Sequence, residues 1–155
     1  MKKCTIIFTH RALKNKTKSD AIYEDLKKLL LKKNYQCLRM NISKQNDELK
    51  VYLKVNNEIT SKQIDFCIVI DDYGVYPFIT LTKYPKHYVA YIEDEHSAYM
   101  TRLHNNANVI IFSQELNSLL NIHYLLSAYL ESHYEAGRHK VRIDMLDEIL
   151  NKGVK

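Results

Sequence analysis

The feature that most constrains the fold is a series of short apolar segments separated by stretches with helical periodicity. The strongest segment, Phe66–Ile70, reads FCIVI and is apolar at every position. A strand that is apolar on both faces is typical of the interior of a parallel sheet, because helices cover both sides of such a sheet. The segment therefore predicts a central strand of an α/β fold.

Four further segments have strand character, and apolar residues recur at helical spacing between them. Strands are expected at Thr5–Phe8, Cys37–Ile42, Tyr88–Ile92 and Val109–Phe112, and helices around Ile22–Leu30, Glu48–Asn57, Pro77–Lys83, Glu95–Asn105, Leu116–Glu131 and Arg138–Leu150. Ser19 or Asp20 is placed to cap the first helix. This alternation predicts a Rossmann-like, doubly wound sheet of about five parallel strands with helices on both faces.

Length and composition indicate one globular domain over residues 1–155. The chain is 46% hydrophobic and 26% charged, which excludes a wholly disordered protein. No apolar stretch approaches the length that spans a membrane, and the run after Lys3 is too short for a signal peptide. We therefore expect a cytoplasmic protein. Cys4, Cys37 and Cys67 fall in separate strands without Cys-x-x-Cys spacing, which indicates buried reduced thiols and no metal site.

The net charge of +5 raises the question of nucleic acid binding. Much of the excess comes from lysines between Lys14 and Lys33, in a loop and on the exposed face of one helix. Such a run usually marks a solvated helix face, and no DNA- or RNA-binding motif accompanies it. We expect no nucleic acid partner and no membrane partner.

Ligands of doubly wound sheets bind at the carboxyl ends of the strands. This rule selects the segments Thr9–Arg11 and Asp71–Gly74, together with the loops that flank the helix ending near His104. His104 and Asn105 offer an imidazole and a carboxamide, suited to proton transfer and hydroxyl binding; alternatively they cap a helix end. Arg138 and Arg142, four residues apart on one helix face, can converge on a phosphate, or form a basic surface or an intersubunit ion pair.

Three longer runs resemble the ribose-5-phosphate isomerase B and galactose-6-phosphate isomerase family, and within it most of all the A-type subunits of galactose-6-phosphate isomerase. The runs are Val69–Phe78, Asp94–Ala107 and Arg138–Leu146. The resemblance implies aldose–ketose isomerisation of a sugar phosphate through an enediolate, without metal or organic cofactor. It also implies a dimer with active sites at the subunit interface, where the C-terminal helix (about 138–151) is expected to lie.

The resemblance also implies roles for individual residues. His104 matches the histidine associated with ring opening, and Asn105 matches its hydrogen-bonding neighbour. Arg138 and Arg142 match the phosphate-binding arginines, whereas His139 is expected to point elsewhere and to be structural. The substrate-binding loops of the family fall at His10 and Arg11, and at Tyr73 and Gly74.

Several positions depart from the wider family. The general-base cysteine of the wider family falls at Asp71, and a threonine of the family falls at Tyr73. The A-type subunits resembled here also have Asp and Tyr at these two places. In the heteromer of A- and B-type subunits, the B-type subunit supplies the cysteine. Asp71 can act as a base if it is desolvated. Alternatively it has a structural role, in which it caps the following helix or pairs with a lysine, and we favour this structural role. Tyr76 is expected to narrow this chain's own pocket, and Asn15–Asp20 resembles an inserted loop.

These features predict a subunit that interconverts D-galactose 6-phosphate and D-tagatose 6-phosphate together with a cysteine-bearing B-type subunit. A homodimer is the alternative assembly. The alternative function is that of a non-catalytic relative, which binds a sugar phosphate or stabilises a partner subunit.

Overall fold

The computed structural model describes residues 1–152 and contains a five-stranded parallel sheet of strand order β2-β1-β3-β5-β4. The strands are β1 (Lys2–Phe8), β2 (Tyr35–Asn41), β3 (Phe66–Asp71), β4 (Val89–Tyr91) and β5 (Val109–Ser113). The expected fold class is confirmed, and the continuously apolar segment is the central strand.

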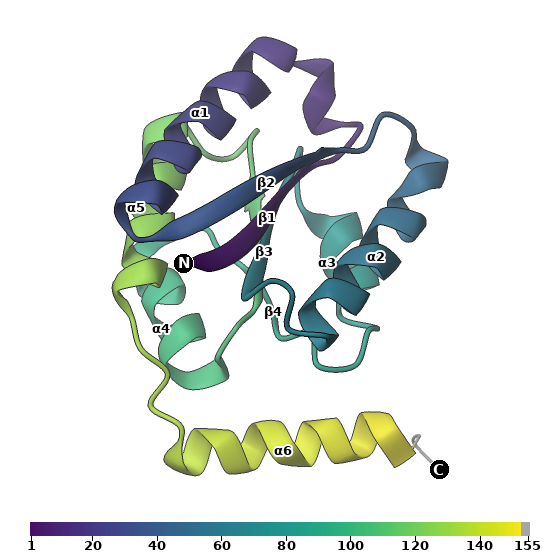
Figure 1. Ribbon diagram of the computed structural model, residues 1–155, viewed down its shortest axis with the longest axis vertical. Helices are drawn as coiled ribbons and strands as arrows, with labels where there is room; N and C mark the ends of the chain where they lie inside the picture. Colours follow the sequence, from purple (N-terminus) through teal and green to yellow (C-terminus); the bar gives the residue numbers. More distant parts are fainter. Residues whose placement is uncertain (153–155) are drawn as a thin grey trace.

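Six α-helices and two 3-10 helices accompany the strands within this part of the chain, and the last two α-helices follow β5. The helices are η1 (Ala12–Lys14), α1 (Lys16–Lys32), η2 (Gln45–Asp47), α2 (Glu48–Thr60), α3 (Val75–Leu81), α4 (Glu95–Asn105), α5 (Leu119–Glu131) and α6 (Gly137–Lys152). The helices α1, α4 and α5 cover one face of the sheet, and α2 and α3 cover the other (Figure 1).

Strand β3 shows how the sequence builds this three-layer arrangement. Successive strand residues point to opposite faces, so Phe66, Ile68 and Ile70 join the core beneath α1, α4 and α5. Cys67 and Val69 join the core beneath α2 and α3. Both faces of β3 are thus buried, which explains why no position in it is polar before Asp71.

The start of α1 differs from the prediction. The helix begins at Lys16, because the side chain of Asn15 accepts a hydrogen bond from the backbone N–H of Lys18 at 3.1 Å and caps it. Ser19 lies inside the helix, where its hydroxyl donates to the carbonyl oxygen of Ala12. The predicted caps, Ser19 and Asp20, are therefore wrong, and Asn15–Asp20 is helix cap and first turn rather than a loop.

Two smaller expectations also need correction. Helix α5 begins at Leu119 rather than Leu116, because the Ser118 side chain caps it by accepting from the N–H of Asn121. Cys37 is only half buried on the edge strand β2, whereas Cys4 and Cys67 are fully buried. All three are free thiols.

Helix α6 lies below the lower end of the sheet in Figure 1. It packs against α4, and its exposed residues include several large apolar ones. These are Val141, Met145, Leu146, Ile149 and Leu150. None of the helices within residues 1–152 has both the length and the apolar character needed to cross a membrane.

Candidate functional site

The predicted site residues fall into two groups at opposite edges of the sheet. His10, Arg11 and Asp71 follow or end strands β1 and β3, and so lie at the carboxyl edge. Helix α4 starts at that edge after β4, runs back along the sheet, and ends at Asn105 shortly before β5 begins at Val109. His104 and Asn105 therefore lie at the amino edge, a strand length away from Asp71.

At the carboxyl edge, the side chain of Asp71 is almost completely buried and fully hydrogen-bonded. Oδ1 accepts from Oγ1 of Thr9 at 2.5 Å and from Nε of Arg11 at 2.9 Å. Oδ2 accepts from the backbone N–H of Gly74 at 2.9 Å, at the start of α3. The carboxylate thus caps the helix that follows and pairs with a cation, but the cation is an arginine and not the expected lysine.

A second buried carboxylate, that of Glu48, completes an ion cluster at this edge. Arg11 contacts Glu48 through Nη2 at 3.1 Å, and Nδ1 of His10 lies 2.7 Å from Oε1 of the same carboxylate. Burial acts to lower the pKa of Arg11, but the charges of Asp71 and Glu48 outweigh it and raise this pKa above its usual value. Arg11 therefore stays charged and balances the buried acids.

Glu48 was not among the predicted site residues, although the sequence carries a signal for it. It shares the buried face of α2 with Tyr52, Val55 and Ile59, at spacings of four, seven and eleven residues. A carboxylate on the buried face of an amphipathic helix requires a partner. The partners, His10 and Arg11, come from a different segment, and only the folded chain identifies them.

The turn after β3 requires a glycine, and a tyrosine close to this turn lies against Arg11. Gly74 has φ of +79°, and a Cβ there would lie 2.5 Å from a ring carbon of Tyr91. The side chain of Tyr73 points outward and is exposed. The guanidinium of Arg11 lies 5.4 Å from the ring centroid of Tyr76, so Tyr76 lies beside the ion cluster. That Tyr76 narrows a ligand pocket stays a prediction.

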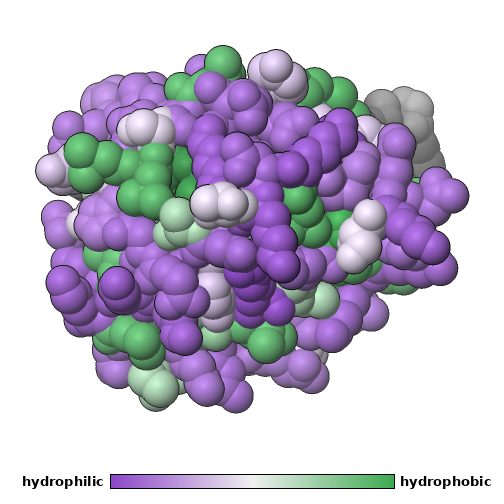
Figure 2. Space-filling model, turned by 90° about the horizontal axis from the view of Figure 1, so that it is seen from above, coloured by the Kyte–Doolittle hydropathy of each residue, from purple (hydrophilic) through white to green (hydrophobic). Residues whose placement is uncertain are grey.

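The carboxyl edge of this chain therefore has its polar groups committed to one another. Asp71 accepts three hydrogen bonds, one of them within its ion pair with Arg11, which leaves it poorly placed to remove a proton from a substrate carbon. The surface seen from above in Figure 2 is mostly hydrophilic with separate hydrophobic patches. This arrangement stabilises the first loop rather than presenting free groups to a ligand.

The amino edge has the opposite character. The ring of His104, near the end of α4, stacks on the ring of His139 in α6, with centroids 3.9 Å apart and planes inclined by 8°. The backbone N–H of Glu135 donates to the carbonyl oxygen of Leu103 at 3.0 Å, which holds the start of α6 against the end of α4. The structure thus brings His104 against α6, the helix that carries both arginines.

The remaining groups at this edge are unpaired within residues 1–152. Asn105, Arg138 and Arg142 are exposed, and in the part of the chain that the structure describes none of their side chains has a hydrogen-bond or ion-pair partner. Arg138 and Arg142 are one turn apart on α6. An imidazole, a carboxamide and two guanidinium groups are therefore presented together, which is a suitable set for a phosphorylated polyol.

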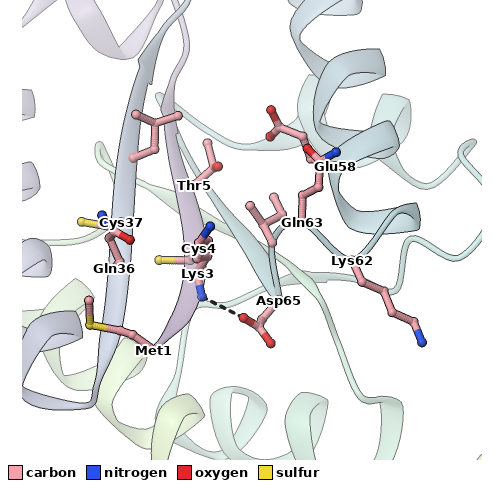
Figure 3. A pocket seen from close by; sticks show the side chains of 12 residues that line it. Met1, Lys3, Cys4, Thr5, Gln36, Cys37, Glu58, Lys62, Gln63 and Asp65 are labelled. Carbon is pink, nitrogen blue, oxygen red and sulfur yellow. Dashed lines mark hydrogen bonds between the residues drawn. The ribbon is translucent and has the colours of Figure 1, made fainter.

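A separate groove of about 630 Å³ lies between β1, β2 and the end of α2 (Figure 3). None of the predicted site residues lines it. Its floor includes Cys4, and burial raises the pKa of this thiol far above its usual value. The backbone N–H of Lys3 donates to Asp65 at 2.8 Å across its lower end. The groove contains no free acid–base pair comparable to the group around His104.

Comparisons with known proteins point to one family. The profile of the family described as Ribose/Galactose Isomerase matches residues 13–146. Galactose-6-phosphate isomerase subunit LacA 2 of Streptococcus pyogenes serotype M3 is 34% identical over 126 residues, which cover 81% of this chain and 89% of that protein. Subunit LacA of Streptococcus pneumoniae is 35% identical over the same length and with the same coverage.

Solved structures of ribose 5-phosphate isomerases share the fold. The enzyme of Thermotoga maritima superimposes with a TM-score of 0.79 at 25% identity, covering 94% of this chain and 97% of its own. That of Mycoplasma genitalium, solved with bound ribulose-5-phosphate, has a TM-score of 0.81 at 20% identity and covers 99% of both chains. With a matching profile over most of its length and LacA relatives above 30% identity, this chain belongs to the ribose/galactose isomerase family.

Proposed function

We propose that this chain is the A-type subunit of a heteromeric isomerase that interconverts D-galactose 6-phosphate and D-tagatose 6-phosphate, and that a homologous B-type subunit supplies the base cysteine. The observation that carries the proposal is a difference between the two edges of the sheet: polar side chains are available at one edge and bound to one another at the other. His104, Asn105, Arg138 and Arg142 are available to a ligand at the amino edge. At the carboxyl edge, His10, Arg11 and Asp71 are bound to one another and to Glu48.

This division requires a second chain. At about 3.3 Å per residue, the six residues of β3 separate the two edges by roughly 16 Å. One sugar phosphate therefore cannot contact His104 and the turn after β3 of the same subunit. A complete site forms when the amino edge of this chain faces the carboxyl edge of a partner that carries the cysteine.

Each group then has a chemical task. His104 moves a proton to and from the ring oxygen as the sugar opens, and Asn105 orients the hydroxyl groups. Arg138 and Arg142 hold the phosphate through charge-assisted hydrogen bonds. The thiolate of the partner moves a proton between the adjacent carbons through the enediolate.

The apolar surface of α6 supports assembly. Met145, Leu146 and Ile149 are more than half exposed on a helix whose main helix contact within residues 1–152 is with α4. Exposed apolar residues in a contiguous group mark an interaction surface. Because Arg138 and Arg142 lie on the same helix, a partner that covers α6 also approaches the phosphate-binding side chains.

The test is isomerisation of galactose 6-phosphate by the purified chain, alone and mixed with a cysteine-bearing homologue from the same family. We expect turnover only in the mixture. In that mixture, His104→Ala in this chain should lower kcat by about 10²–10⁴-fold, with assembly intact. Arg138→Ala and Arg142→Ala should mainly raise KM for the phosphorylated sugar.

His10→Gln is the matched control, because it removes an imidazole from the opposite edge. We expect it to leave turnover unchanged. Loss of turnover in His10→Gln with normal turnover in His104→Ala would overturn the assignment of the edges. A mixture that assembles but is inactive would favour the non-catalytic relative instead.

A further inference from the structure

His139 does not point away from the site, contrary to the expectation from sequence. Its imidazole is 8% exposed and lies face to face with that of His104. Nε2 of His139 is buried and has no hydrogen-bond partner within residues 1–152. A buried ring nitrogen without a partner is unfavourable, so a residue retained only for packing would be better served by an apolar ring.

A metal ion does not account for the cluster. His104, His139 and Glu135 place one ligand atom each within 4.8 Å of one another. An imidazole binds a metal through a lone pair in the plane of its ring. Two rings that are stacked within 8° of parallel cannot both aim their lone pairs at one ion. The stack itself is therefore the feature to explain.

The surroundings of His139 favour its neutral form. Burial lowers its pKa, and the neighbouring His104, Arg138 and Arg142 act in the same direction, while Glu135 opposes them weakly. Nε2 of His139 lies 4.0 Å from the carboxylate of Glu135, too far for a hydrogen bond. A neutral, flat ring thus lies against one face of His104.

We propose that His139 is a positioning residue, which fixes the plane of the His104 imidazole and shields one of its faces from water. The inference rests on the proposed role of His104 in proton transfer. Proton transfer requires the donor nitrogen to be held in line with the acceptor oxygen. With the ring of His104 held by the stack, its edge remains available toward the side of the substrate, next to Arg138 and Arg142.

Two substitutions separate stacking from other roles of His139. His139→Phe keeps a flat ring and removes both nitrogens, whereas His139→Ala removes the ring. In the purified chain, the ring protons of His104 should resonate upfield of those of the exposed His133, because of the ring current of His139. His139→Phe should retain this shift and His139→Ala should abolish it, with His104→Gln identifying the signals.

The kinetic measurement uses the active mixture with the B-type homologue. His139→Ala should lower kcat about tenfold with little change in KM, and His139→Phe should retain most of kcat. Equal losses in both variants would show that a nitrogen is needed and would overturn positioning by stacking, as would unchanged kcat in His139→Ala. An inactive wild-type mixture would instead refute the proposed function, while the spectra of the isolated chain would still decide whether the stack exists.

Discussion

Arg11 and the buried carboxylate of Asp71 form an ion pair at the carboxyl edge of the sheet, with Nε of Arg11 donating to Oδ1 of Asp71 at 2.9 Å. The family resemblance implies a cysteine at the position of Asp71. Replacing a thiol by a buried carboxylate introduces a charge that must be balanced, and Arg11 balances it together with that of Glu48. The change at Asp71 and the presence of Arg11 are thus physically linked.

This linkage predicts a large loss of stability in Arg11→Met. The substitution keeps much of the side-chain volume but leaves two buried carboxylates without a cation. We expect the free energy of unfolding to fall by about 3 kcal/mol, measured by urea denaturation. Adding Glu48→Gln to Arg11→Met should recover part of the loss.

Lys33→Met is the control, because it breaks the exposed pair between Lys33 and Glu131, also 2.9 Å long. We expect a change of less than about 1 kcal/mol. Similar losses in Arg11→Met and Lys33→Met would mean that burial of the Arg11 cluster has no energetic consequence.

The turn after β3 predicts unequal effects of alanine at two glycines. Gly74→Ala combines a left-handed backbone with a Cβ only 2.5 Å from the ring of Tyr91, so it should cost about 3 kcal/mol. Gly137 also has a positive φ, of +53°, but a Cβ there meets nothing within 4 Å. Gly137→Ala should therefore cost only about 1 kcal/mol. Thermal unfolding of both variants provides the comparison, and equal shifts would contradict the steric argument.

The sequence predicted the strands most closely where they are compact apolar runs, as in β3 and β5, and less closely for the edge strand β2 (Tyr35–Asn41, expected at Cys37–Ile42), which alternates half-buried and exposed residues. It misplaced the start of α1 because the first turn is rich in lysine and has no apolar periodicity. The start of that helix depends on one side-chain hydrogen bond from Asn15. Such a bond competes with other caps nearby, and only the backbone geometry shows which one forms.

The candidate site was harder to predict because it depends on contacts between distant segments. The residue types at His104, Arg138 and Arg142 suggested phosphate chemistry. The rule for doubly wound sheets, however, pointed to the carboxyl ends of the strands, whereas the helix that carries His104 ends at the amino edge. The direction of α6 depends on Ala136 and Gly137, which both have positive φ. This reversal turns His139 onto His104, and no periodicity within α6 reports it.

His87 provides a prediction about pH. It is buried just before β4, and burial lowers its pKa to about 4 from an ordinary value of 6.5. The folded chain therefore binds fewer protons than the unfolded chain between these values, and stability falls as the pH decreases through this window. The contribution of His87 should reach about 3 kcal/mol at pH 4.

His87→Phe should remove this contribution while keeping the contact with the ring of Tyr84, whose centroid lies 5.4 Å from that of His87. The measurement is urea unfolding at pH 7 and at pH 4.5, with the loss on acidification smaller in the variant. His133→Phe, at an exposed position, should leave the loss unchanged. A variant His87→Phe that loses as much stability as the wild-type chain would exclude His87 as the source.

The exposed apolar residues of α6 predict that substitutions on this helix prevent association without unfolding the chain. Met145 and Ile149 are 61% and 51% exposed, four residues apart on a helix whose main packing contact within residues 1–152 is with α4. Met145→Glu with Ile149→Lys should prevent association, because burying these charges at an interface is unfavourable. The fold should persist, since neither side chain contributes to a core cluster. Light scattering should report the loss of the oligomer, and circular dichroism should be unchanged.

Leu53→Glu is the control, because it lies at an equally exposed apolar residue on α2. It should leave association intact. If both sets of substitutions abolish association, α6 is not the specific contact. If neither set abolishes it, the partner covers another surface, and Arg138 and Arg142 do not approach the partner through α6.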